Sequence, residues 1–158
     1  MDEFSVEFMR EAIRYSKQNL DDGSGGPFGA VIVKDQKIIA GASNKVTSAN
    51  DPTAHAEMEA IRLACKNLNN FSLEGCIIYT SCEPCPMCLS AIHWARIDKI
   101  YHANTREDAA EIDFDDHHIY KEVTKPAHER IIPMIQMMHE EAKKVFDEWK
   151  NKTDKIHY

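Results

Sequence analysis

The sequence predicts a layered α/β domain, because helical and β-strand patterns alternate along the middle of the chain. After a first β-hairpin the order is helix, strand, helix, strand, and this order needs crossover connections between strands. The chain has 158 residues, of which 43% are hydrophobic and 28% charged, so it can bury the core of one ordinary globular domain. We therefore expect residues 1–158 to form a single domain.

The N-terminal part of the chain predicts one helix and one hairpin. Apolar residues repeat at helical spacing from about residue 4 to residue 20, and Asp2 is a candidate cap for the start of this helix. A loop rich in glycine follows at residues 21–27 and ends the helix. Two β-patterned runs come next, at residues 28–33 and 37–42, and the short polar stretch between them predicts a hairpin turn.

The central part of the chain predicts two helix–strand units. Polar residues 43–53 lead into a helix expected at residues 54–68. A short apolar β-run at residues 76–80 precedes a cysteine-containing turn and a second helix that continues to Ala95. Residues 100–103 have the pattern of a further strand.

The C-terminal part is less regular. Beyond Thr105 the pattern weakens until apolar residues at helical spacing between residues 138 and 149 predict an amphipathic helix. Residues 151–158 form a short polar tail that ends in an aromatic residue. No repeat or low-complexity segment interrupts the chain.

Charge and cysteine content restrict the class of partner and the compartment. The net charge of −7 and the pI of about 5.6 disfavour a polyanionic partner such as tRNA, which requires a surface rich in lysine and arginine. No apolar stretch is long enough to span a membrane, and the N-terminus lacks the pattern of a signal peptide. An odd number of cysteines, five, argues against a secreted disulfide framework. We expect a cytoplasmic protein that contacts neither nucleic acid nor membrane.

Two short motifs predict a catalytic zinc site. His55 in the first motif, with Cys85 and Cys88 in the second, can bind one Zn²⁺ through three protein ligands and leave its fourth position open. An open fourth position is typical of catalytic zinc, whereas structural zinc is usually bound by four protein ligands. The combined pattern H-x-E … P-C-x-x-C is the signature of zinc nucleobase deaminases, in which the glutamate, here Glu57, transfers protons.

The spacing of these residues predicts how they meet. Cys85 and Cys88 are three positions apart, so on the first turn of a helix they face the same way. His55 and Glu57 are two positions apart and can approach one metal only if it lies beyond the N-terminal end of their helix. We therefore expect two helix N-termini to converge on one ion, with zinc-bound hydroxide as the nucleophile and Glu57 as proton shuttle in a hydrolytic deamination.

Two other interpretations of the cysteine pair exist. A closed structural zinc would need a fourth ligand, for which Cys82 is the nearest candidate. A redox-active C-x-x-C pair needs no histidine and glutamate and leaves His55 and Glu57 unexplained. The histidine–glutamate pair at a predicted helix start favours catalytic zinc over both.

At these motifs the chain resembles the cytidine deaminase superfamily, and within it the compact bacterial guanine deaminases. The matching segments are residues 25–33, 50–57, 79–88, 94–96, 114–116 and 119–122, together with Tyr158. The resemblance implies a three-layer αβα sandwich with a central mixed five-stranded sheet flanked by helices. It also implies a domain-swapped homodimer, in which the C-terminal segment crosses over and the tail at residues 151–158 reaches the pocket of the partner subunit.

The resemblance further implies a purine substrate and the side chains that contact it. The substrate contacts it implies are Phe28, Asn44, Ala56, Trp94, Asp116 and Tyr158. Phe28 and Trp94 could stack on a flat ring, although aromatic residues are more often part of a core. Asp116 could accept hydrogen bonds from the N–H groups of guanine, and otherwise belongs to a solvated acidic turn. Guanine is thus the expected substrate; guanosine, cytosine and tRNA adenosine are alternatives, as is a non-catalytic interaction module held together by zinc.

Overall fold

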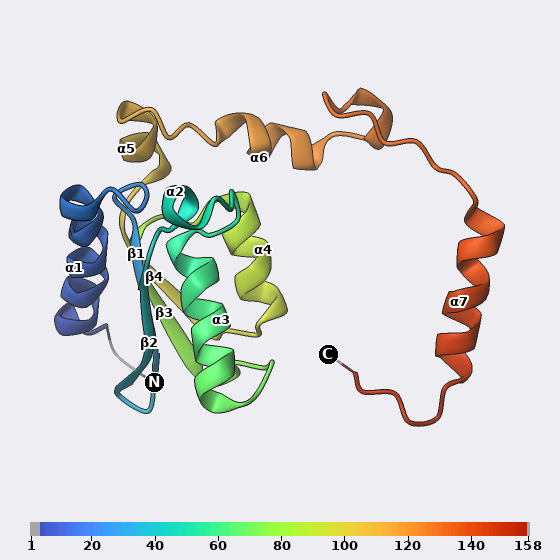
Figure 1. The fold of residues 1–158 in the computed structure, drawn as a ribbon, viewed down its shortest axis with the longest axis horizontal. Coiled ribbons are helices and arrows are strands. Elements are labelled where there is room, and N and C mark those ends of the chain that lie inside the picture. The colour runs from blue at the N-terminus through green and yellow to red at the C-terminus, as the bar shows by residue number, and fades with distance from the viewer. Residues whose placement is uncertain (1–3, 158) are drawn as a thin grey trace. The chain divides into compact units, whose positions relative to one another are not determined.

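The computed structural model describes residues 4–157 in two compact parts that divide after His117 (Figure 1). The elements of the first part are α1 (Val6–Asp22), β1 (Gly29–Lys34), β2 (Lys37–Ser43), α2 (Val46–Ala49), α3 (Ala56–Leu68), β3 (Cys76–Cys82), α4 (Pro86–Trp94), β4 (Lys99–Asn104) and α5 (Arg106–Glu111). The helices and strands that the sequence predicts between residues 4 and 104 are all present. The candidate cap Asp2 lies outside the described residues.

One mixed sheet forms the centre of the first part. Its strands are arranged in the order β2-β1-β3-β4, with β1 antiparallel to both of its neighbours and β3 parallel to β4. The hairpin between β1 and β2 turns at Asp35 and Gln36, whose positive φ angles of 48° and 59° match the right-handed twist of the strands. The parallel pair requires a crossover, which α4 supplies.

The prediction of a five-stranded sheet is wrong for the described part of the chain, in which this sheet has four strands. After β4 the chain enters α5, whose start is fixed by a capping box between Thr105 and Asp108. The segment that follows is rich in aspartate, a residue that is depleted in strands. These local preferences direct the chain into helices and turns.

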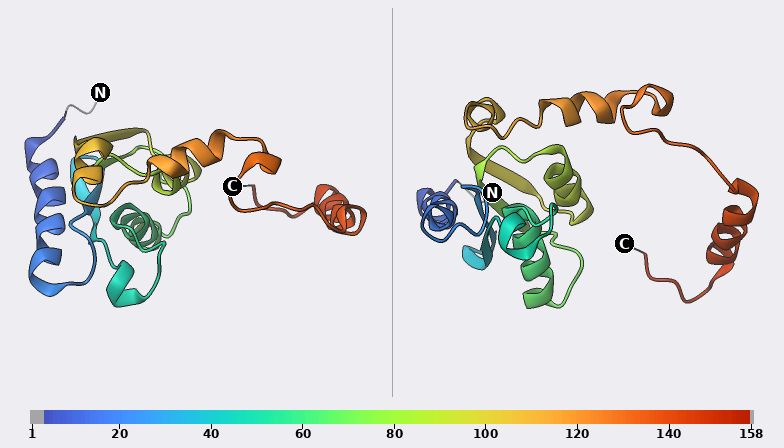
Figure 2. Two further views of the ribbon diagram at one scale, coloured as in Figure 1. Left: turned by 90° about the horizontal axis from the view of Figure 1, so that it is seen from above. Right: turned by 45° about the horizontal axis from the view of Figure 1, so that its top comes forward.

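Helices cover both faces of the sheet, as two views show (Figures 1 and 2). On one face α1 packs against β1, with Met9 and Ala12 buried beside Val31 and Tyr79. On the other face α3 and α4 enclose a second core, in which small alanine side chains of α3 allow the helix to lie close to the strands. The sheet therefore fixes the N-terminal ends of α3 and α4 on one face.

The second part, residues 118–157, contains most of α6 (His117–Thr124), the short 3₁₀ helix η1 (Ala127–Glu129) and α7 (His139–Asn151). The predicted amphipathic helix is confirmed as α7. Many large apolar side chains of this part are exposed, among them Ile131, Ile132, Ile135, Met137, Val145 and Phe146. Among the described residues no helix has the length and apolar character needed to span a membrane.

Candidate active site

The zinc ligands predicted from the sequence lie at two helix N-termini on the same face of the sheet. His55 is the N-cap residue of α3, and Cys85 is the N-cap residue of α4. Both have extended backbone conformation, with ψ of 156° and 168°, so their side chains project beyond the ends of the helices. Pro86 occupies the first helical position of α4, where a missing N–H costs no hydrogen bond, and Cys88 lies in the same turn. The predicted convergence of two helix N-termini is confirmed.

The three ligand atoms have the spacing that zinc needs. The Nδ1 atom of His55 lies 3.6 Å from the Cys85 sulfur and 3.5 Å from the Cys88 sulfur. All three atoms lie within 4.8 Å of one another. Tetrahedral zinc with Zn–S bonds of about 2.3 Å and Zn–N bonds of about 2.0 Å places sulfur and nitrogen about 3.5 Å apart. The donor set and its spacing therefore fit Zn²⁺.

The electrostatics of the three ligands favour a cation between them. The side-chain interaction with Cys88, helped by that with His55, lowers the pKa of Cys85 to about 4, so Cys85 readily loses its proton. The hydrogen bond with Cys85 raises the pKa of His55 above its ordinary value of 6.5 even though burial acts in the opposite direction. The adjacent Cys85 thiolate, together with burial, raises the pKa of Cys88. A divalent cation would allow both sulfurs to bind as thiolates.

Glu57 lies beside the ligands in the first turn of α3. Its side chain is buried, and its Oε2 atom accepts a hydrogen bond from the Cys88 thiol at 3.5 Å. Burial raises the pKa of Glu57 above its ordinary value of 4.5. A carboxylate with a raised pKa is a stronger base than an ordinary glutamate, which suits it to accepting and returning a proton beside a metal site.

Cys82 is not part of the ligand cluster. Its thiol donates a hydrogen bond of 3.3 Å to the carbonyl oxygen of Thr105, and burial raises its pKa to about 11. Among residues 4–157 the group that could hold a metal consists of His55, Cys85 and Cys88. The described residues thus provide the three-ligand, open arrangement and do not supply Cys82 as a fourth ligand.

Asn44 and Phe28 are held close together by backbone contacts. The amide N–H of Asn44 donates to the Phe28 carbonyl at 3.0 Å, and its side-chain Oδ1 accepts from the N–H of Val46 at 3.0 Å. Phe28 is half-buried, and its ring meets that of Phe114 edge-on at a centroid distance of 4.9 Å. Because Oδ1 of Asn44 is occupied by its own turn, the group it can offer to a ligand is the side-chain N–H₂.

The other expected substrate residues have different environments. Ala56 is fully buried at the first position of α3, between His55 and Glu57. Trp94 ends α4 and is 69% exposed, so it is not the core residue that the alternative interpretation would require. Partial burial, followed by the charge of Cys85, raises the pKa of Asp116, which interacts electrostatically with His55 as well. Tyr158 lies outside the described residues.

Three features near these residues were not assigned from the sequence. Asn19 of α1 is a buried amide that donates to the carbonyl oxygens of Gly26 and Asn44. Phe114 packs on Phe28. The Gly25–Gly26 loop presses on the same group, since a Cβ atom at Gly25 would lie 2.2 Å from Oδ1 of Asn44. The paired glycines were the available signal, because they indicate close approach of two backbone segments.

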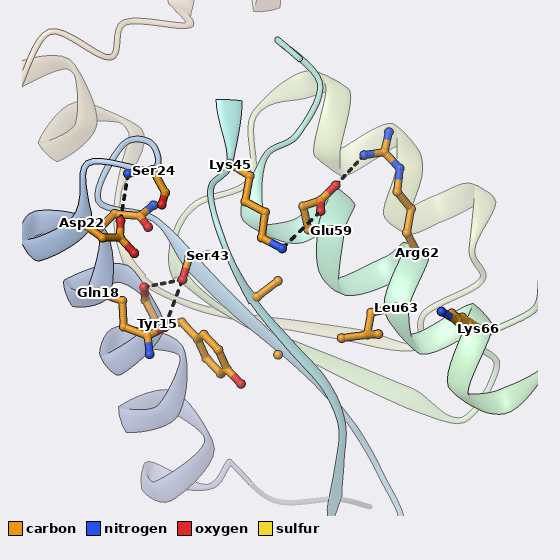
Figure 3. Close-up of a pocket in the computed structure, with 13 residues that line it drawn as sticks. Tyr15, Gln18, Asp22, Ser24, Ser43, Lys45, Glu59, Arg62, Leu63 and Lys66 are labelled. Atoms are coloured by element: carbon orange, nitrogen blue, oxygen red, sulfur yellow. Dashed lines mark hydrogen bonds and ion pairs between the residues drawn. The ribbon is translucent and has the colours of Figure 1, made fainter. Parts of the chain in front are cut away.

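A separate pocket lies between α1, β2 and α3 (Figure 3). Charged side chains pair within it, since Glu59 of α3 contacts Arg62 of the same helix at 2.7 Å and Lys45, which precedes α2, at 4.0 Å. On the opposite wall Ser43 donates to the carbonyl oxygen of Tyr15. None of the zinc-ligand residues lines this pocket.

The geometry of the ligand cluster agrees with the comparison of the chain with protein families. The sequence model of the cytidine and deoxycytidylate deaminase zinc-binding region matches residues 2–104, a segment that contains all three ligands and Glu57. The chain belongs to this family. A guanine deaminase of Bacillus subtilis (strain 168) is 53% identical over 151 residues, which are 96% of this chain and 97% of the relative.

Two further comparisons concern a relative that matches a shorter stretch of the chain and a solved structure with the same fold. A tRNA-specific adenosine deaminase of Aquifex aeolicus (strain VF5) is 47% identical over 93 residues, 59% of this chain and 61% of the relative. The X-ray structure of guanine deaminase from Bacillus subtilis superposes with a TM-score of 0.94, at 52% identity, and covers 98% of this chain and 99% of that structure. The likeness to guanine deaminase therefore continues through the residues that follow the family segment.

Proposed function

We propose that the chain is a zinc-dependent guanine deaminase that converts guanine and water to xanthine and ammonia. The observation that carries this proposal is the cluster of His55, Cys85 and Cys88 beside the buried carboxyl group of Glu57. The 53% identity with a guanine deaminase over nearly the whole of both chains supports the choice of substrate.

The metal ligands and Glu57 have different roles in the proposed reaction. Zinc held by His55, Cys85 and Cys88 would supply the activation of water, because it lowers the pKa of water towards neutrality. Oε2 of Glu57 accepts the proton of the attacking water and delivers it to a ring nitrogen of guanine. Glu57 then takes the remaining proton from the added hydroxyl group and passes it to the amino group. The C–N bond breaks, ammonia leaves and a carbonyl oxygen takes its place.

In this proposal side chains from several elements hold the purine. Phe28 and Trp94 supply aromatic surfaces for the ring. The side-chain N–H₂ of Asn44 donates to a ring acceptor, and Asp116 accepts from ring N–H groups. Ala56 lines the site between His55 and Glu57, and Tyr158 completes it from the C-terminal tail.

The acidic character of the chain supports a small substrate over tRNA. A net charge of −7 is unfavourable for a partner that is recognised through its phosphates. The tRNA-specific relative matches 59% of the chain, whereas the guanine deaminase relative matches 96%. These two observations favour the free base.

The proposed active form is a homodimer in which the C-terminal segment, including residues 151–158, crosses to the partner. The exposed apolar side chains of residues 118–157 support it, because large apolar patches usually mark an interaction surface. Light scattering after gel filtration tests the dimer, for which the expected mass is twice the chain mass of 18.0 kDa.

The proposed compartment is the cytoplasm. The five free cysteines, two of them zinc ligands in this proposal, suit its reducing conditions.

The test of the activity is incubation of the zinc-loaded protein with guanine while xanthine is measured by mass spectrometry. Guanosine, cytosine and tRNA are assayed in parallel, and tRNA binding is measured at two salt concentrations. Turnover of guanine supports the proposal. Preferred turnover of tRNA adenosine, with affinity that falls steeply with salt, would replace it with the tRNA alternative. Absence of any turnover with one zinc per chain would leave the non-catalytic zinc module.

A further inference from the structure

We infer that Asn19 is a positioning residue for substrate binding, although it lies on α1 and belongs to neither zinc motif. Its side chain is 5% exposed and bridges two segments that carry proposed substrate contacts. The Nδ2 atom donates to the carbonyl oxygen of Gly26 at 2.8 Å and to that of Asn44 at 2.7 Å. Both hydrogens of one amide are therefore used to fix these segments against each other.

The two segments are packed so tightly that their relative position determines where the substrate contacts lie. A Cβ atom at Gly25 would meet Oδ1 of Asn44 at 2.2 Å and its carbonyl oxygen at 2.6 Å. A Cβ atom at Gly26 would lie 2.9 Å from Cζ of Phe114 and 3.0 Å from Cε2 of Phe28. A shift of the loop would therefore displace the amide of Asn44 and the ring of Phe28 together.

The backbone continues this connection from the loop to Asn44. The N–H of Phe28 donates to the Gly26 carbonyl at 2.8 Å, and the N–H of Asn44 donates to the Phe28 carbonyl at 3.0 Å. Asn19 closes this chain of hydrogen bonds, because it binds the carbonyl oxygens at both ends, those of Gly26 and Asn44.

The chemistry of asparagine suits this position. The bridge needs two donors on a short side chain in a buried place, and an amide group is the short side chain that provides them. Leucine has nearly the same shape and no donor, and aspartate has the same size with acceptors in place of the donors. Either substitution removes the Asn19 donor from the buried Asn44 carbonyl oxygen and leaves the Gly26 carbonyl oxygen with the N–H of Phe28 alone. Local movement of the loop would relieve the cost of the lost hydrogen bonds.

The test compares Asn19→Leu and Asn19→Asp with Ser43→Ala, each in the zinc-loaded full chain. Ser43 is the matched control because its hydroxyl also joins β2 to α1, by a hydrogen bond of 2.8 Å to the Tyr15 carbonyl (Figure 3). It contacts neither Gly26 nor the Asn44 carbonyl. All variants should keep one zinc per chain, which metal analysis measures.

The expected result is a rise in the KM for guanine. In both Asn19 variants kcat/KM should fall by about 10- to 100-fold, because small displacements of positioning groups have effects of this size. The loss should appear mainly in KM, since Glu57 and the zinc ligands are untouched, and Ser43→Ala should keep the wild-type KM. Should Asn19→Leu fail to fold, Asn19→Asp carries the test because it keeps the size of the side chain.

A second measurement does not depend on the substrate. Hydrogen exchange of the amide protons of Phe28 and Asn44 should be faster in the Asn19 variants than in Ser43→Ala. Wild-type KM and unchanged exchange in a folded Asn19 variant would overturn the inference. Because it rests on the proposed function, wild-type protein is assayed beside the variants: failure of the wild type to convert guanine overturns the proposed function, whereas wild-type turnover with unaffected variants overturns the role of Asn19 alone.

Discussion

The imidazole nitrogen Nδ1 of His55 lies 3.5 Å from the sulfur of Cys88, although the two residues are 33 positions apart in the chain. The contact exists because α3 and α4 begin at the same end of one face of the sheet. The first helix contributes its N-cap residue His55, and the second contributes its N-cap residue Cys85 together with Cys88 of its first turn. The site is therefore a property of the assembled sheet.

Replacement of Glu57 should separate metal binding from catalysis. Glu57→Gln keeps the shape of the buried side chain and removes its ability to transfer a proton, so turnover of guanine should fall by about 100-fold or more. Zinc content, measured by mass spectrometry of the metal, should stay at one per chain. Glu59→Gln is the control on the same helix, since Glu59 pairs with Arg62 and Lys45 away from the ligands. Equal activity of the two variants would argue against the assigned role of Glu57.

Removal of zinc should lower both activity and stability. A ligand that binds only the folded state, at a free concentration of about 1,000 times its Kd, adds about 4 kcal/mol to the free energy of unfolding. For a chain of this size this corresponds to a Tm change on the order of 10 °C. Cys88→Ser should reproduce the effect of a chelator, whereas Cys82→Ser should keep full zinc content. Loss of zinc in Cys82→Ser would indicate a closed structural site instead.

The stability of the metal-free protein should depend on pH through Glu57. Burial raises the folded-state pKa of Glu57 above 4.5, so its contribution to stability is fully present below that pH and is lost as pH rises through the folded pKa. Metal-free Glu57→Gln should therefore melt at a higher temperature than metal-free wild type at pH 8, with the difference disappearing near pH 4. Melting curves of both proteins at several pH values measure this, and a difference that is the same at every pH would contradict it.

Substitution of Gly25 should affect catalysis, whereas substitution of Gly23 should affect stability. Gly25→Ala places a methyl group 2.2 Å from Oδ1 of Asn44, so kcat/KM for guanine should fall at least about 10-fold while zinc is retained. Gly23→Ala meets nothing within 4 Å but has a φ of 67°, so it should cost about 1 kcal/mol of stability and leave KM unchanged. Steady-state kinetics and thermal melts of both variants distinguish the two effects.

Shortening of the C-terminal tail tests the proposed contact of Tyr158. Deletion of residues 156–158 should raise the KM for guanine. It should leave zinc content and Tm unchanged, because the removed residues all follow the end of α7. Kinetics identical to the full chain would show that the tail does not take part in substrate binding.

The parts of the structure that depend on local pattern were predictable from the sequence. Apolar periodicity predicts α1, α3 and α7, and the spacing of Cys85 and Cys88 predicts a shared helical turn. The fifth strand followed from the resemblance alone, without a β pattern in the chain, and the described residues do not contain it. The start of α5 had a local signal in Thr105 and Asp108, which form its capping box.

The role of Asn19 had no local signal. Its two acceptors are backbone carbonyl oxygens 7 and 25 positions away. Every residue has a backbone carbonyl, so the sequence does not indicate which of them accept a hydrogen bond from Asn19. The raised pKa of Glu57 could not be predicted from the sequence either. It depends on how deeply the side chain is buried once the sheet and helices have assembled.

The chain leaves the sheet next to Cys82, which lies three positions before the proposed zinc ligand Cys85. Cys82 pairs with Asn104 in the parallel ladder, and the thiol of Cys82 is bonded to Thr105, the residue from which the rest of the chain departs. A protein that exchanged everything after this point would keep its four strands, its three metal ligands and Glu57. Of the proposed substrate contacts, Asp116 and Tyr158 lie beyond this point. Exchange of one contiguous terminal segment would therefore alter part of the substrate site and leave the chemical groups of the reaction in place.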